Sequence, residues 1–129
     1  MLLLVIKILL TGAFFIEGAL NLYWVASGKL PEDAVIPFED GSPLFEPEPL
    51  ITVAAGVLEW IAAMIVVLPG TRLKLALGAL LLLRSIGEFQ YIGFFKRVRG
   101  SRYAKLDTWL YSPLCFAQAA GIFWLVQFS

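Results

Sequence analysis

The sequence contains no histidine and only one cysteine, Cys115. Without histidine the chain lacks the commonest metal ligand and the side chain that usually titrates near neutral pH, so we expect no metal site and no cofactor. A single cysteine cannot form a disulfide within the chain, and no histidine is present to activate it as a nucleophile. Cys115 is therefore interpreted as a packing residue.

Charged residues are also scarce, at 16% of the chain, and the ten basic and ten acidic residues cancel. This balance gives no net field to attract nucleic acid, which is excluded as a partner. Hydrophobic residues reach 60% of the chain and the mean hydropathy is +0.83, above the values typical of soluble domains. The sequence has no phosphate-binding loop and no dinucleotide-binding motif. An integral membrane protein is the class that remains.

The apolar residues are gathered in four blocks, each long enough to cross the hydrocarbon core. The turn at Pro69-Gly70 is short, so the second and third blocks are expected to be antiparallel neighbours. We predict an all-α fold: an integral membrane four-helix up-down-up-down bundle forming one domain over residues 1–129. The predicted helices cover residues 2–26, 50–68, 73–95 and 108–128.

Two long connections should then lie at the same end of the bundle. Residues 27–49 are rich in proline and acidic side chains, and residues 96–107 are basic. The first is either a solvated loop or an ordered lid, for which Val35, Ile36, Phe38, Leu44 and Phe45 would be the apolar anchors. Opposite charge predicts that the two loops associate. Because lysine and arginine concentrate in these loops, we expect them in the cytoplasm.

The basic loop has a second interpretation beyond that of a topology signal. Its cations could bind the headgroups of anionic lipids, with aromatic residues beside them at the membrane surface. The residues expected to make these contacts are Lys96, Arg97, Arg99, Arg102 and Lys105. Membrane lipid is accordingly one expected partner.

Polar residues of the four blocks share one depth, roughly 10–17 Å below the long-loop end. They are Glu17, Glu59, Arg84, Glu88 and Gln118. Charges facing lipid are costly, so this layer should face the bundle interior. Arg84 is expected to fork between Glu88 and a carboxylate from Glu17 or Glu59. One carboxyl is then left over and should be protonated or matched by a bound cation.

The leading hypothesis is that this layer binds a small polar or cationic amphiphilic ligand, with proton-coupled transport as an extension. The expected ligand-binding residues are Glu17, Asn21, Glu59, Arg84, Glu88, Tyr91, Tyr111 and Gln118. One alternative is a structural or accessory subunit in which the layer only fixes helix packing. A second is a membrane-embedded isomerase or lipid-modifying enzyme using glutamate as acid and base, although no spacing demands catalysis. A homodimer is compatible with every option.

From Asn21 to Cys115 the chain resembles a family of small four-helix membrane proteins, widespread in bacteria, that is defined only as a domain of unknown function. The specific part is Asp107 followed by Tyr111-Ser112-Pro113-Leu114-Cys115; the weaker matches are Tyr23-Trp24, Gly28, Pro37, Arg84, Gly87, Tyr91, Gly93, Lys96 and Arg99. The resemblance implies the four-helix fold, a bacterial inner membrane location and attention to Arg84, Glu88 and Asp107. Family members often have histidine where this chain has Asn21, so this chain either lacks any proton-transfer or metal-binding role of that histidine or uses Glu17, one turn away, for it. The resemblance implies no activity.

Overall fold

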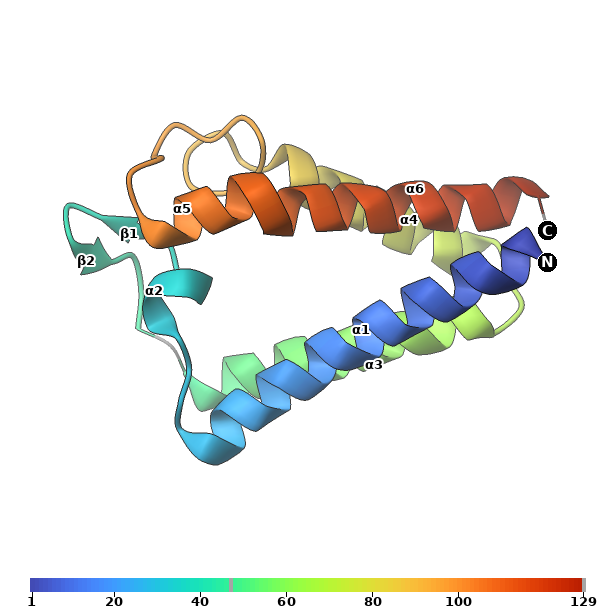
Figure 1. Cartoon of the computed structure of the whole chain (residues 1–129), viewed down its shortest axis with the longest axis horizontal. Helices are drawn as coiled ribbons and strands as arrows, with labels where there is room; N and C mark the ends of the chain where they lie inside the picture. Colours follow the sequence, from blue (N-terminus) through green and yellow to red (C-terminus); the bar gives the residue numbers. More distant parts are fainter. Residues whose placement is uncertain (47, 129) are drawn as a thin grey trace.

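The computed structural model describes residues 1–46 and 48–128 and is mostly helical (Figure 1). Its long helices are α1 (Leu2–Ser27), α3 (Pro49–Val67), α4 (Arg72–Ile86) and α6 (Ser112–Phe128). The short elements are α2 (Glu32–Val35), α5 (Arg102–Leu106), a π-helical turn (Asp107–Tyr111) and the antiparallel strands β1 (Phe38–Glu39) and β2 (Ser42–Pro43). The all-α prediction thus holds for the helices and omits the small sheet.

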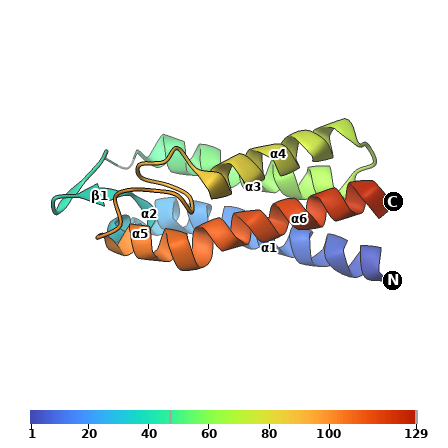
Figure 2. The same cartoon turned by 90° about the horizontal axis from the view of Figure 1, so that it is seen from above.

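The long helices form two pairs, α1 with α3 and α4 with α6. Figure 1 shows the pairs converging at the end that holds both termini and separating toward the end that holds the long loops, and Figure 2 shows the four long helices running along the same long axis of the molecule. Glycine allows α1 to approach α3 closely, because a Cβ at Gly18 would lie 2.5 Å from the Trp60 ring. The buried apolar core lies in the converging half and consists of Leu10, Phe14, Ala62, Ala63, Val66, Ile122 and Leu125.

Three helical segments in the described chain are long and apolar enough to cross a membrane. They are Leu2–Ser27, Pro49–Val67 and the continuous run Arg102–Phe128. Helix α4 has 15 residues and is about 22 Å long, which is less than the ~30 Å of a bilayer core. The predicted membrane class therefore fits three of the four expected spans by length and composition.

The predicted third helix over residues 73–95 is wrong in its second half. Helix α4 ends at Ile86, because Gly87 has a φ of 84° and turns the chain. The backbone then crosses itself at Gly93, whose φ is 91°. A Cβ at Gly93 would lie 2.2 Å from the Ile86 carbonyl oxygen, so only glycine fits this crossing. Residues 87–101 consequently form an ordered non-helical loop.

Both predicted loops contain regular structure. The basic segment 96–107 becomes helical at Arg102, where the Ser101 hydroxyl accepts a hydrogen bond of 3.0 Å from the Ala104 amide. The acidic segment 27–49 contains α2 and the β-hairpin; its Ile36 is buried, whereas Leu44 and Phe45 are exposed. Pro47, one of the prolines of this segment, lies outside the described residues.

The predicted association of the two loops is confirmed. Arg102 and Asp33 form an exposed ion pair of 3.1 Å between α5 and α2. The Tyr111 hydroxyl donates a hydrogen bond of 2.6 Å to the Ala34 carbonyl. These contacts join the first loop to the start of the last long helical segment at the loop end (Figure 1).

Candidate functional site

A buried carboxylate, Asp107, is the centre of the first charged cluster. Its Oδ1 accepts from Arg84 Nη2 at 2.7 Å and from the Ser112 hydroxyl at 3.1 Å. Its Oδ2 accepts from the Gly93 amide at 2.7 Å and lies 3.2 Å from Lys96 Nζ. The Asp107 side chain is fully buried, so these partners replace the water that the charge would otherwise require.

The two cations around Asp107 have further partners. Lys96 Nζ donates to the Gly93 carbonyl at 3.1 Å and to the Thr108 hydroxyl at 2.5 Å, and its side chain is fully buried. Arg84 Nη2 also donates to the Tyr103 hydroxyl at 3.0 Å. The cluster therefore holds two positive charges against one negative charge and connects α4, the 87–101 loop and the π-helical turn.

The predicted pairing of Arg84 with Glu88 is wrong. Glu88 lies beyond the end of α4 and is exposed, so it does not belong to the interior layer. Its Oε1 instead accepts from the backbone amides of Gln90 at 3.1 Å, Ile92 at 3.1 Å and Tyr91. These N–H groups stabilise the carboxylate and hold the pKa of Glu88 below its ordinary value. Glu88 thus orders the 87–101 loop.

The second cluster joins α1, α3 and α6 through the predicted layer residues Glu17, Glu59 and Gln118. The Gln118 amide donates a hydrogen bond of 2.9 Å to Glu17 Oε1, and the Glu59 carboxyl lies close enough to the Glu17 carboxyl to interact with it. Gln118 is buried, and both glutamates are half-buried. Asn21, one turn from Glu17, donates to the Glu17 backbone carbonyl at 3.0 Å.

No basic side chain in the described chain forms an ion pair with Glu17 or Glu59. The ion pairs within residues 1–46 and 48–128 are Arg84–Asp107, Lys96–Asp107 and Arg102–Asp33. Because Arg84 is committed to Asp107, the carboxyl pair lacks the counter-charge that the sequence predicted for it. We call Glu17 and Glu59 the carboxyl pair.

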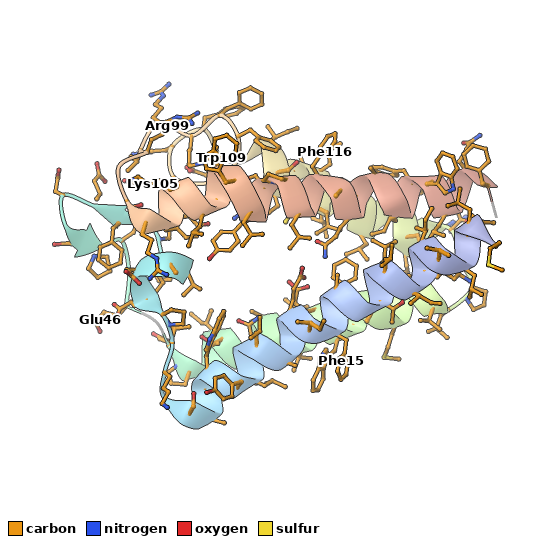
Figure 3. The ribbon with its side chains drawn as sticks, viewed as in Figure 1. Phe15, Glu46, Arg99, Lys105, Trp109 and Phe116 are labelled. Carbon is orange, nitrogen blue, oxygen red and sulfur yellow. The ribbon has the colours of Figure 1, made fainter. Side chains whose placement is uncertain are left out.

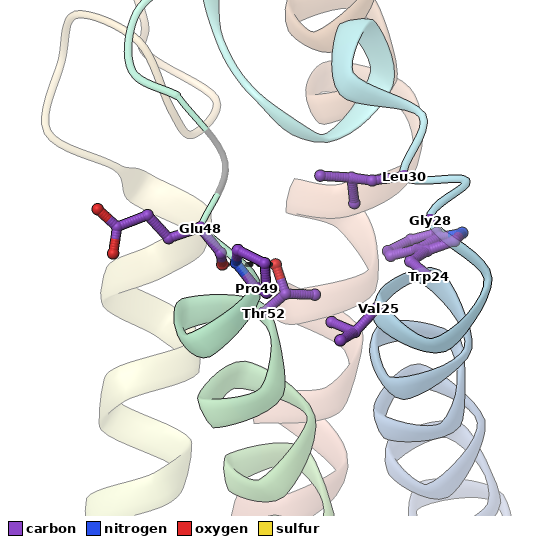
Figure 4. A pocket seen from close by; sticks show the side chains of 7 residues that line it. All are labelled: Trp24, Val25, Gly28, Leu30, Glu48, Pro49 and Thr52. Atoms are coloured by element: carbon purple, nitrogen blue, oxygen red, sulfur yellow. Dashed lines mark hydrogen bonds between the residues drawn. The ribbon is translucent and has the colours of Figure 1, made fainter.

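Two small cavities lie beneath the first loop, at the loop end of α1 and α3. One, of about 160 Å³, is lined by Asn21, Trp24, Ile36 and Phe45 among others. The neighbouring one, of about 150 Å³, lies between the end of α1 and the start of α3 (Figure 4). In Figure 4 Val25 and Thr52 extend toward the space between the two helices, whereas the Glu48 carboxylate extends away from Trp24.

An apolar groove of about 360 Å³ runs between α1 and α6. Ile6, Leu9, Leu10 and Ala13 line it from α1, and Leu114, Ala117, Gln118 and Gly121 line it from α6. Gln118 is the polar residue of this lining, and it is hydrogen-bonded to Glu17. The groove therefore includes one side chain, Gln118, that contacts the carboxyl pair.

The two tyrosines predicted to bind ligand, Tyr91 and Tyr111, form hydrogen bonds away from the carboxyl pair. Tyr91 donates a hydrogen bond of 2.6 Å to Glu39 of the β-hairpin, and the neighbouring carboxylate raises the pKa of Tyr91. Tyr111 donates to Ala34, as described above. The predicted ligand-binding residues are thus divided. Glu17, Asn21, Glu59 and Gln118 lie together, and Arg84 belongs to the Asp107 cluster. Glu88, Tyr91 and Tyr111 form hydrogen bonds within and between the loops.

The five residues predicted to contact lipid headgroups fall into two groups, those that form ion pairs within the protein and those that do not. Lys96 is buried against Asp107 and Arg102 is paired with Asp33, whereas Arg97, Arg99 and Lys105 are exposed. Helical periodicity did not predict that Lys96 and Tyr103 are buried, because both lie in the segment that follows the chain reversal at Gly87. The available signal was Asp107 itself, an acidic residue within an otherwise basic stretch.

The comparisons with known proteins give a family and no activity. The family model described as "Protein of unknown function (DUF3995)" matches residues 14–122. This range covers most of the 129 residues and includes both charged clusters, so the chain belongs to that family. No curated protein and no solved structure matches the chain.

Proposed function

We propose that this member of the DUF3995 family is a small integral membrane protein that binds a cationic amphiphile, with the cationic head against the carboxyl pair. The observation that carries the proposal is the close approach of the Glu17 and Glu59 carboxyls in the absence of an ion pair to either residue in the described chain. Arg84, the nearest predicted counter-charge, is held by Asp107.

Two carboxylates in contact cannot both carry charge without a large cost in a weakly polar interior. They share one proton, or a bound cation offsets their charge. The Gln118 amide fixes Glu17 Oε1 and leaves the rest of the pair available to a ligand. Binding of an ammonium group would displace the shared proton, and this exchange is the basis for proposing proton coupling.

The surroundings support an amphiphile over a small hydrophilic cation. An alkyl chain fits the apolar groove between α1 and α6, which has Gln118 in its lining beside Glu17. A cavity at the loop end offers a second approach, because Asn21 and Trp24 line it about one turn beyond Glu17. The face of an indole ring attracts cations, so Trp24 would favour an ammonium group entering there.

The proposal includes a topology of four crossing segments. Helix α4 provides the fourth crossing, and the loop that follows it lies at the boundary of the hydrocarbon core, where four of its backbone amides donate to the Asp107 and Glu88 carboxylates. Basic residues are concentrated at the long-loop end, which favours the cytoplasmic side of a bacterial inner membrane for these loops.

Thermal unfolding of the purified protein in a neutral detergent tests the proposal. Dodecyltrimethylammonium should raise the Tm in a concentration-dependent way, more at high pH than at low pH, because the proton and the cation compete. Dodecylphosphocholine, which has the same alkyl chain and no net charge, should give a smaller shift. Glu59→Gln should abolish the difference between the two compounds, and Glu46→Gln, a change at an exposed loop carboxylate, should preserve it.

A folded wild-type protein with equal responses to both compounds would refute the proposal. So would a folded Glu59→Gln variant that keeps the cation-specific shift. Glu17→Gln provides a second test of the same pair. If all the variants respond alike, the structural-subunit alternative is favoured, because the Gln118–Glu17 bond between α6 and α1 would then serve packing alone.

A further inference from the structure

The 87–101 loop and the helical turn beside it carry large aromatic side chains on the outside of the molecule. Phe89 is 56% exposed, Phe95 is 61% exposed and Trp109 is 83% exposed. The rings of Phe89 and Phe95 lie 6.5 Å apart. Three exposed cations, Arg97, Arg99 and Lys105, accompany them. We call these six residues the loop face.

The loop face stands on an ordered backbone. Inside the loop, the Gly93 amide donates to Asp107, and Glu88 collects the amides of residues 90–92. The Phe94 amide donates to the Ser85 carbonyl at 2.8 Å. Phe89 has a φ of 72°, a left-handed conformation that side chains with a Cβ rarely adopt. The exposure of these aromatic groups is therefore part of a defined loop conformation.

The position of the loop along the helices places this face at a membrane surface. Helix α4 stops after about 22 Å, short of a ~30 Å bilayer core. The segment Arg102–Phe128 continues past it, and the loop lies beside the first turns of that segment (Figure 1). Figure 3 shows Arg99, Lys105 and Trp109 at this same end. Aromatic residues mixed with cations are typical of the boundary between hydrocarbon and headgroups.

The charges of the loop face are available for an external anion. Arg97 and Lys105 form no ion pair in the described chain, and Arg99 uses one nitrogen to donate to the Phe94 carbonyl at 2.9 Å. The other two basic residues of this segment are already committed, Lys96 to Asp107 and Arg102 to Asp33. The nearest carboxylate in the loop, Glu88, is engaged by backbone amides.

We propose that the loop face is a binding site for anionic phospholipid, with Arg97, Arg99 and Lys105 on the phosphate-containing headgroup and Phe89, Phe95 and Trp109 among the upper acyl carbons. Guanidinium groups bind phosphate through paired hydrogen bonds, and aromatic rings tolerate the boundary region. The ring pair beside the cations favours lipid over a soluble phosphate, which would leave these rings in water. This site is separate from the carboxyl pair and does not depend on a ligand there.

The test compares lipid binding by the full-length protein in neutral-detergent micelles, using dioleoylphosphatidylglycerol and dioleoylphosphatidylcholine as probes. We expect a preference for phosphatidylglycerol, with each cation contributing about fivefold in affinity. Arg97→Gln/Arg99→Gln should lower the affinity for phosphatidylglycerol by about 25-fold and leave that for phosphatidylcholine unchanged. Arg72→Gln, an exposed arginine at the opposite end, is the matched control and should change neither affinity.

Several outcomes would overturn the site. An unchanged preference in the folded double variant would show that the loop cations do not select the headgroup. An equal loss in Arg72→Gln would show a general charge effect. Competition by millimolar inorganic phosphate as effective as that by lipid would assign the site to soluble anions. For the unmodified protein, a preference that does not fall with added salt would also refute the proposal, whether or not the double variant folds.

Discussion

Replacing Asp107 by asparagine should cause a large loss of stability. The change keeps the shape of the side chain and removes the charge that faces Arg84 at 2.7 Å and Lys96 at 3.2 Å. The Lys96 side chain is fully buried and Arg84 is 28% exposed, so water cannot replace the lost carboxylate at Lys96. Removing one partner of a buried ion pair costs about 3–5 kcal/mol. With two cations left behind, we expect the upper half of that range.

The measurement is reversible unfolding in mixed micelles, followed by far-ultraviolet circular dichroism as the fraction of denaturing detergent rises. Asp33→Asn provides the control, because Asp33 faces Arg102 at a similar distance of 3.1 Å but both side chains are more than half exposed. Exposed pairs contribute only ~0–1 kcal/mol. If Asp107→Asn lost no more stability than Asp33→Asn, the buried cluster could not be what holds the 87–101 loop in place.

Two further predictions concern that loop. Glu88→Gln should reduce the hydrogen-exchange protection of amides 90–92. In the wild type this protection should be complete above about pH 4.5 and should be lost as the pH falls through the lowered pKa of Glu88. A loop without this carboxylate contact would show neither effect. Gly93→Ala should destabilise the protein by at least ~2 kcal/mol in the same micelle unfolding assay, because its Cβ would lie 2.2 Å from the Ile86 carbonyl oxygen. Gly100→Ala is the control and should change stability little, because the space around Gly100 is open. Equal effects of the two substitutions would argue against the backbone crossing at Gly93.

The sequence was informative wherever a helix alone decides the position of a residue. Depth along α1, α3 and α6 correctly brought Glu17, Glu59 and Gln118 to one level, because a helix rises by a fixed amount per residue. The opposite charges of the two loops also predicted their association, which the Arg102–Asp33 pair confirms. Both deductions needed only spacing and charge.

The sequence was misleading where the chain reverses. Residues 87–95 are largely apolar and contain no proline, so continued helix was the natural prediction for them. The structure ends α4 at Ile86 because Gly87 and Gly93 cross at a distance that admits no Cβ. A close approach of two backbone segments is a tertiary contact, and neither glycine reveals its partner through local periodicity.

The error over Arg84 follows from that reversal. Spacing within one helix offered Glu88 as its partner, one turn away. After the reversal, Asp107 lies nearer than Glu88 and brings hydrogen bonds from Gly93 and Ser112 with it. A buried carboxylate with several donors is a better partner for arginine than an exposed one, so the more distant residue in the sequence forms the pair.

The two clusters together explain why the carboxyl pair can persist in the interior. The Asp107 cluster has an excess of one positive charge, since Arg84 and Lys96 face a single carboxylate. Glu17 and Glu59 carry one negative charge if they share a proton. The interior is then neutral as a whole, which is the least costly state within a membrane. Exchange of the shared proton for a monovalent ammonium group preserves that neutrality, so the proposed ligand adds no charge to the interior when it binds.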